Sequence, residues 1–401
     1  MRKVLVLSPC DVFPPVHGSS TAIYHTLQFL SQGSRVAAVL CYLYSQHGTV
    51  DLAGPNLRIE HLPPGPIDRL GYKGLAFNPG YYRLAARVMS EFQPDVIQAE
   101  LLWTAPAALW LRRRWHRPVV LMQENVEYQK FVRFGQKSPL LRLVRWLEAW
   151  ACRSADRVVA LSEVDRDLMA ELYGLDPAAM TIIPHGVDPE LFDYRPDGAA
   201  AARAKLGVEP GALLLTFVGK LDYVPNVRAV GYIADQIAPA VWKRYPAARF
   251  AIIGQGQEAV ARYARDGLLF TGFVDARPGS RPNLSDYLSA SDVVLVPLDA
   301  GSGTRLKILE AAANARPILS TRIGAEGLGF ADGREILLTD AVDEAFVERT
   351  LRLLDDAGLR ETLRTAARQR VLDQYSWHAQ VSKMQQVHEE LCAGQPSQKN
   401  G

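Results

Sequence analysis

Four consecutive small residues join an apolar run to a helical pattern, and their types suit phosphate binding. The apolar run spans 293–296, the helical pattern spans 305–315, and the loop between them contains Gly301, Ser302, Gly303 and Thr304. Glycine lets a backbone come close to a ligand, and the free N–H groups at a helix start attract anions. The loop therefore predicts a phosphate site; the alternative is an ordinary turn between a strand and a helix.

Two charged residues on the helix after this loop extend the prediction from a phosphate to a nucleotide. Lys307 lies in the first turn, where the helix dipole disfavours a cation unless an anion lies close by. Glu310 follows three residues later and shares the same helix face, so its carboxylate could accept hydrogen bonds from sugar hydroxyls. The alternative for this segment is a solvent-facing Lys/Glu pair.

Short β-branched runs alternate with helical patterns along the whole chain, which predicts an α/β protein with parallel sheets. The first series of predicted strands comprises 3–7, 35–41, 57–61, 95–98, 119–122, 157–161 and 181–183. The second series comprises 213–218, 249–253, 268–271, 293–296, 318–320 and 335–338. Between them, 184–211 is rich in proline, glycine and alanine and predicts a linker. Two doubly wound domains place ligands at the carboxyl ends of their strands.

Composition excludes several classes of protein. The 401 residues carry 45 Lys plus Arg and 43 Asp plus Glu, and this small net charge of +2 argues against a nucleic-acid partner. An apolar content of 48% excludes a disordered chain, and no run approaches the roughly 18 apolar residues of a membrane span. The cysteines, which lack metal-ligand spacing, fit a reducing compartment: Cys10, Cys41, Cys152 and Cys392. We therefore expect a cytoplasmic location, with the inner face of a membrane as a further option.

Several stretches, taken in order, resemble the GT-B glycosyltransferases of family 4, the retaining group 1 transferases, of the polysaccharide-biosynthesis type. The stretches are FVGKLDYVPN at 217–226, IIGQG at 252–256, LFTGF at 269–273, GSGTRLKILE at 301–310, RPILST at 316–321 and GAEGL at 324–328. The resemblance implies two Rossmann-like domains facing a cleft. The acceptor-side domain would comprise 1–184 plus a crossover helix in 377–401, and the donor domain would comprise 185–376.

The resemblance also implies roles for individual residues of the donor domain. Glu310 would bind the ribose of a nucleotide-sugar donor. Ser302 would be a further donor-binding residue, at a position eight residues earlier where the family commonly carries a second glutamate. The diphosphate would be held by Gly219, Lys220, Gly303, Thr304 and Lys307. Neutralised phosphates stabilise a leaving nucleotide, so the resemblance implies no cofactor and no metal. For Lys220 the alternative is a strand-end lysine in solvent.

Two segments of the first half resemble the acceptor-side loops of the same family. PPVHGSS at 14–20 resembles the family's glycine loop, in which Gly18 and Ser19 would face the donor phosphates and the acceptor. ENVEY at 124–128 resembles a histidine-containing segment, but Glu124 stands where the histidine would be. Glu124 could replace the histidine as a hydrogen-bond acceptor near the transferred sugar; the alternative is a strand-end carboxylate without a catalytic role.

A basic and aromatic segment spans 103–153. Ten Lys and Arg stand against three Glu there, and Trp and Phe residues are interleaved with them. Such a segment could contact an anionic membrane surface near a lipid-linked acceptor. The alternative is a solvated basic face whose aromatic residues belong to the core.

We expect the chain to be a metal-independent hexosyltransferase that moves a sugar from a nucleotide-diphosphate donor to a glycan or lipid-linked acceptor. Two other readings remain open. One is a catalytically silent GT-B subunit that binds a nucleotide sugar, which Ser302 and Glu124 favour. The other is a nucleotide-sugar epimerase, which lacks an obvious pair of facing acid/base carboxylates.

Overall fold

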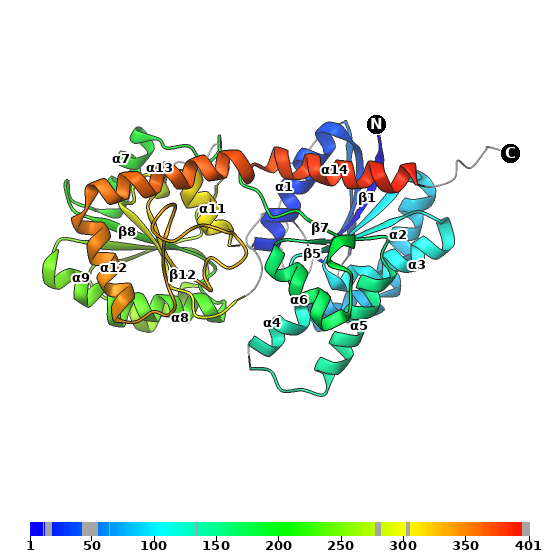
Figure 1. Ribbon diagram of the computed structural model, residues 1–401, viewed down its shortest axis with the longest axis horizontal. Helices are drawn as coiled ribbons and strands as arrows, with labels where there is room; N and C mark the ends of the chain where they lie inside the picture. Colours follow the sequence, from blue (N-terminus) through cyan, green and yellow to red (C-terminus); the bar gives the residue numbers. More distant parts are fainter. Residues whose placement is uncertain are drawn as a thin grey trace. The chain divides into compact units, whose positions relative to one another are not determined.

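Short aliphatic runs form two parallel sheets in the computed structural model, which describes residues 1–10, 12, 18–41, 55–63, 65–133, 135–276, 282–301 and 305–394. Residues 1–185 and 377–401 form one compact unit, here unit 1, and residues 186–376 form unit 2. In each unit, helices cover both faces of the sheet (Figure 1). This arrangement confirms the predicted α/β class with doubly wound sheets.

Unit 1 contains a seven-stranded sheet in the order β3-β2-β1-β4-β5-β6-β7. Its strands are β1 (Lys3–Leu7), β2 (Arg35–Cys41), β3 (Leu57–Leu62), β4 (Val96–Glu100), β5 (Val119–Gln123), β6 (Arg157–Ala160) and β7 (Met180–Ile182). Its α-helices are α1 (Gly18–Gly33), α2 (Pro79–Phe92), α3 (Ala105–Trp115), α4 (Glu127–Arg133), α5 (Leu140–Ser154), α6 (Glu163–Tyr173) and α14 (Trp377–Ala393). Three 3₁₀ segments complete the unit: η1 (Pro66–Phe77), η2 (Leu102–Thr104) and η3 (Pro177–Ala179).

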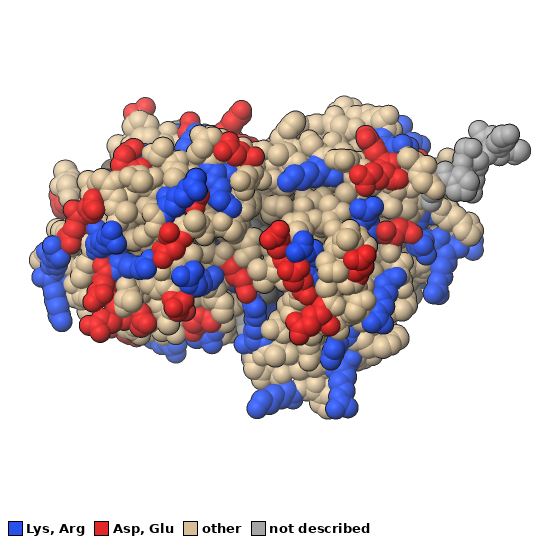
Figure 2. All heavy atoms as spheres, viewed as in Figure 1, with Lys and Arg blue, Asp and Glu red and all other residues tan. Residues whose placement is uncertain are grey.

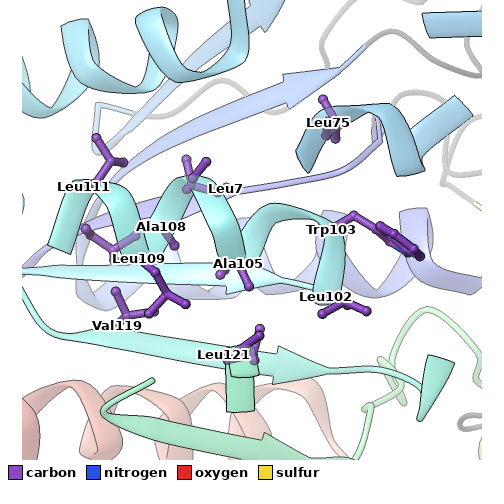
Figure 3. Close-up of a cluster of buried hydrophobic side chains, with 14 of the residues drawn as sticks. Leu7, Leu75, Leu102, Trp103, Ala105, Ala108, Leu109, Leu111, Val119 and Leu121 are labelled. Carbon is purple, nitrogen blue, oxygen red and sulfur yellow. The ribbon is translucent and has the colours of Figure 1, made fainter. Parts of the chain in front are cut away.

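The central strands of unit 1, β1, β4 and β5, are buried on both faces, which explains their continuous apolar runs. Along β1, Val4 and Val6 pack in a core with residues of α1 and α14, whereas Leu5 and Leu7 pack in a second core with residues of α2 and α3. Figure 3 shows part of this second core, where side chains of α3 face Leu121 of β5.

Unit 2 contains a six-stranded sheet in the order β10-β9-β8-β11-β12-β13. Its strands are β8 (Leu214–Val218), β9 (Arg249–Ile253), β10 (Leu268–Gly272), β11 (Val293–Val296), β12 (Ile318–Thr321) and β13 (Leu337–Thr339). Its helices are α7 (Pro196–Leu206), α8 (Val224–Tyr232), the π-helical turn η4 (Ile233–Ile237), α9 (Ala238–Arg244), the 3₁₀ segment η5 (Gln257–Tyr263), α10 (Leu284–Ser289), α11 (Leu306–Ala313), α12 (Glu344–Asp355) and α13 (Ala357–Gln374).

The prediction of a linker over 184–211 is wrong, because this stretch contains helix α7. Pro196 occupies the first turn, where its missing N–H costs nothing, and the following alanines favour a helix. Gly207 ends the helix with a positive φ of 65°. Ala202 is fully buried, and α7 packs against α10. The alanine content therefore reflects close helix packing and not flexibility.

No helix within the described ranges is long and apolar enough to cross a membrane.

Candidate functional site

The candidate donor site lies at the carboxyl edge of the unit 2 sheet. Strands β8 and β11 are parallel neighbours, so the residues that follow them meet at the same edge. Gly219 and Lys220 follow β8, and α11 begins after the loop that follows β11. Lys307, in the first turn of α11, lies with its ammonium nitrogen 4.4 Å from the centre of the Phe217 ring of β8. The fold thus brings two distant sequence segments together around one cation.

Lys307 is a cation whose described neighbours do not neutralise it. Its Nζ donates a 3.0 Å hydrogen bond to Oδ1 of Asn226, a neutral acceptor. No carboxylate of the described part of the chain lies within ion-pair distance of this nitrogen. Burial, followed by the positive charge of Arg305, lowers the pKa of Lys307 to about 7, although Glu310 acts in the opposite direction. A bound anion would restore the missing counter-charge.

Asn226 is part of this site, and the sequence reasoning did not single it out. Its Nδ2 donates a 2.8 Å hydrogen bond to the carbonyl of Lys220 while its Oδ1 accepts from Lys307. A Cβ at Gly219 would lie 2.8 Å from Asn226 Nδ2 and 2.9 Å from Lys307 Nζ, so a side chain there would displace both. The available signal was a polar residue eight positions after a predicted strand, in the first turn of the helix that follows Lys220.

Glu310 lies one turn after Lys307 on α11 and is only partly shielded from solvent. Desolvation raises its pKa to about 7, and the positive charge of Lys307 opposes this rise. Among the described residues, no side chain donates a hydrogen bond to its carboxylate. The carboxylate is therefore placed to accept hydrogen bonds from a ligand.

Lys220 forms an ion pair with Asp222 at 3.3 Å. About a third of its side chain is exposed, so its position fits both a phosphate contact and a strand-end lysine in solvent. Ser302, Gly303 and Thr304 lie outside the described residues. Gly301, which precedes them, has a φ of 137°, and a Cβ there would lie 2.7 Å from the buried Arg305 guanidinium. Arg305 thus adds a second cation near Lys307.

The acceptor-side candidates of unit 1 also come together. Ser19 lies in the first turn of α1, and its hydroxyl hydrogen-bonds the carboxyl group of Glu124, which follows β5. Glu124 is 97% buried, and its Oε2 has no hydrogen-bond partner in the part of the chain that the structure describes. Gly18 begins α1, and no atom of the described residues lies within 4 Å of the place where a Cβ would stand, so these residues do not require glycine there.

A second buried carboxyl group lies near Glu124. Glu100 ends β4, the neighbour of β5, and Gln98 donates a hydrogen bond to its Oε1. Burial raises the pKa of Glu124 to about 8, and the nearby Glu100 adds to the rise. The pKa of Glu100 rises to about 7 for the same reason, burial. Two carboxyl groups at adjacent strand ends can therefore hold protons near neutral pH and donate hydrogen bonds. Sequence reasoning missed Glu100.

The chain contains one Asp-x-Asp sequence, at Asp165 and Asp167. It lies in the first turn of α6, where Asp165 and the N-cap Ser162 hydrogen-bond each other and Asp167 pairs with Arg166. These contacts explain both aspartates as helix-capping and surface groups. Among the described residues, no cluster of three or more His, Cys, Asp or Glu is arranged to hold a metal ion.

Two parallel-sheet units with this connectivity define a GT-B fold. Sucrose-phosphate synthase from Thermosynechococcus elongatus superimposes with a TM-score of 0.82 at 19% identity, over 98% of this chain and 100% of that chain. Anabaena HepE, solved in complex with UDP and glucose, superimposes with a TM-score of 0.73 at 15% identity, over 97% of this chain and all of that chain. These likenesses show the fold.

The sequence places the chain within a family. Residues 18–191 match Glycosyltransferase Family 4, and residues 212–356 match Glycosyl transferases group 1. The chain therefore belongs to the family 4 glycosyltransferases, which use nucleotide-sugar donors.

Curated relatives include D-inositol 3-phosphate glycosyltransferases. The protein from Kineococcus radiotolerans is 27% identical over 390 residues, covering 90% of this chain and 87% of the relative. The protein from Kribbella flavida is 29% identical over 342 residues, covering 78% of this chain and 76% of the relative. These names do not point specifically to polysaccharide biosynthesis, which was the narrower expectation from the sequence.

Proposed function

We propose that the chain is a retaining, metal-independent hexosyltransferase that transfers a sugar from a nucleoside-diphosphate donor to a hydroxyl group of a glycan or a lipid-linked acceptor. Unit 2 binds the donor, and unit 1 provides the acceptor-side residues. The observation that carries the proposal is the Lys307 ammonium group, which lacks a neutralising carboxylate among the described residues and lies one turn before Glu310.

The donor phosphates bind at the start of α11. Lys307 and Arg305 supply positive charge, Lys220 contributes from the end of β8, and the N–H groups of Gly303 and Thr304 complete the phosphate contacts. Charge neutralisation stabilises the nucleoside diphosphate as it leaves, so the step proceeds without a metal ion. Glu310 accepts hydrogen bonds from the ribose hydroxyls, and Ser302 lies beside the transferred sugar.

The acceptor-side residues that we propose for unit 1 are Gly18, Ser19 and Glu124. Glu124 stands where the family resemblance places a histidine, and its raised pKa keeps it protonated near neutral pH. A neutral carboxyl group both donates and accepts a hydrogen bond, as a neutral histidine does. Its Oε2, which is buried and has no hydrogen-bond partner among the described residues, is the atom that we propose for hydrogen bonding to a sugar hydroxyl.

A polyol phosphate is a second acceptor class to test, because the relatives described above are D-inositol 3-phosphate glycosyltransferases. The two acceptor classes differ in charge. A polyol phosphate needs a cationic subsite in unit 1, whereas an uncharged glycan hydroxyl does not. Parallel assays with myo-inositol phosphates and with oligosaccharides therefore separate the two acceptor classes.

A panel of UDP-, GDP- and ADP-sugars tests the proposal. The purified chain should bind one nucleoside diphosphate with a micromolar dissociation constant, and should hydrolyse or transfer the matching sugar slowly. Lys307→Met should weaken binding, whereas Lys243→Met, at an exposed lysine of α9, should not. Binding without turnover of any donor would favour the silent subunit, and interconversion of two nucleotide sugars without acceptor would favour an epimerase.

A further inference from the structure

The amino-terminal half of α5 turns apolar side chains toward solvent. Leu140 is 67% exposed, Leu143 is 53% exposed and Trp146 is 61% exposed. They recur every three residues and therefore lie near one another along the helix surface. Trp146 also stacks on Trp150, with ring centres 6.4 Å apart and planes 9° apart, which extends the apolar surface by a further turn. A helix of a soluble protein normally buries such a face.

A buried carboxyl group explains why this face points outward. Glu148, which is fully buried, accepts hydrogen bonds from the backbone N–H groups of Glu127 and Tyr128 at 2.8 and 3.0 Å. The Tyr173 hydroxyl and the Gln123 side chain donate to it as well. These bonds fix the rotation of α5 about its axis. Trp146, two positions away, is then held on nearly the opposite side of the helix.

The sequence around this apolar surface is basic. Residues 128–147 contain five Lys and Arg and no Asp or Glu. Lys137, Arg142 and Arg145 are exposed. Helices α4 and α5 extend away from the unit 1 sheet (Figure 1), and the tip of this extension shows only basic and uncharged residues in the face seen in Figure 2. Other arginines of 103–153 are engaged within the protein. Arg112 pairs with Asp156, and Arg153 donates to the carbonyl of Tyr173. Arg145, although exposed, donates to the carbonyl of Leu172.

We propose that Leu140, Arg142, Leu143 and Trp146, here the α5 outer face, dock on an anionic lipid surface. Leucine and tryptophan side chains enter the boundary between headgroups and acyl chains, while Arg142 contacts lipid phosphates. The exposure of Trp146 contradicts the alternative in which the aromatic residues of this helix all belong to the core. A second copy of the chain is a less suitable occupant, because a symmetric contact would bring two sets of like charges together.

Vesicle sedimentation of the full chain tests this surface, which is separate from the donor site. We expect binding to vesicles of phosphatidylglycerol and phosphatidylcholine, with much weaker binding to phosphatidylcholine alone. Leu143→Ser with Trp146→Ser should reduce the partition coefficient by about tenfold or more, because both side chains lose apolar burial. Arg142→Gln should reduce it by about fivefold. Leu372→Ser, at a leucine of α13 that is 44% exposed, is the matched control and should bind as the wild type does.

Three results would overturn the assignment. The first is equal binding to anionic and neutral vesicles, and the second is unchanged binding of the double variant. The third is a wild-type chain that binds neither vesicle and is a dimer, together with a double variant that is a monomer. That result would show that a second copy of the chain covers the α5 outer face. Circular dichroism of the same samples checks that the variants are folded, and because it needs no nucleotide it keeps this test independent of the donor-site proposal.

Discussion

Replacing Lys307 with methionine should stabilise the nucleotide-free protein and weaken nucleotide binding. Burial lowers the pKa of Lys307 from 10.5 to about 7. At about 1.4 kcal/mol per pKa unit, the charged form costs at most about 4–5 kcal/mol in the folded state. Methionine keeps the packing on Phe217 but loses a cation–π contact of about 1 kcal/mol. It also loses the hydrogen bond to Asn226, worth about 1–2 kcal/mol. The expected net stabilisation is therefore about 1–3 kcal/mol.

The pH dependence of the stabilisation distinguishes the removal of a buried charge from a general improvement in packing. A lysine whose folded pKa lies below its unfolded pKa binds fewer protons in the folded state between pH 7 and 10.5. The wild type therefore gains stability as the pH rises through this window, and it loses that contribution as the pH falls toward 7. The advantage of Lys307→Met should be largest near pH 6.5 and should shrink toward pH 9.5. Urea unfolding at both pH values measures it, with Lys243→Met as the exposed control.

Nucleotide binding should change in the opposite direction. A charged hydrogen bond to phosphate contributes about 1.5–3 kcal/mol, so the dissociation constant for UDP should rise by about 10- to 150-fold. Isothermal titration calorimetry of wild type, Lys307→Met and Lys243→Met measures this difference. A Lys307→Met protein that is destabilised at both pH values and binds UDP as tightly as the wild type would refute the role given to this lysine.

Three further changes test other parts of the structure. Gly219→Ala should weaken UDP binding by about tenfold in calorimetry, because the new Cβ would displace the side chains of Lys307 and Asn226. A Gly219→Ala protein that binds UDP as tightly as the wild type would contradict this steric argument. Glu148→Gln should lower the free energy of unfolding in urea by about 1–3 kcal/mol, because an amide group would face two backbone N–H donors. The free energy of unfolding of Glu124→Gln should rise relative to that of the wild type as the pH rises from 4.5 to 8. In the wild type, the folded state holds the Glu124 proton up to about pH 8 and the unfolded state releases it near pH 4.5, so the wild type loses stability across this window. Thermal denaturation at pH 5 and pH 8 measures this gain, and an equal difference at both values would show that Glu124 is ionised when folded.

The strands were predictable because each is a short apolar run with a local signal. The predicted ranges 3–7, 35–41, 249–253 and 293–296 agree with the observed strands to the residue. Helices were harder where local composition was ambiguous. Alanine, glycine and proline in 196–206 suggested a linker, and only the packing of α7 against α10 shows why alanine is needed there.

Lys307 and Glu310 could be proposed as donor-site residues from the sequence alone because they lie on one helix turn after a glycine loop. Asn226 could not, because its role depends on its reaching Lys307, 81 positions away, across the edge of the sheet. Glu100 likewise could not be proposed from the sequence, because its role depends on its lying close to Glu124 at the end of a neighbouring strand. Spacing along the chain reports neighbours on a helix but not neighbours across strands.

The sequence by itself determined the order of strands and helices, the two parallel sheets and the glycine loop with its charged helix, because these depend on local periodicity and residue type. Tertiary structure decided which groups lose water and which face they occupy. Burial sets the protonation of Lys307, Glu124 and Glu100, and the hydrogen bonds of Glu148 turn the apolar face of α5 outward. Desolvation and helix rotation arise from contacts between residues far apart in the chain, so no local pattern contains them.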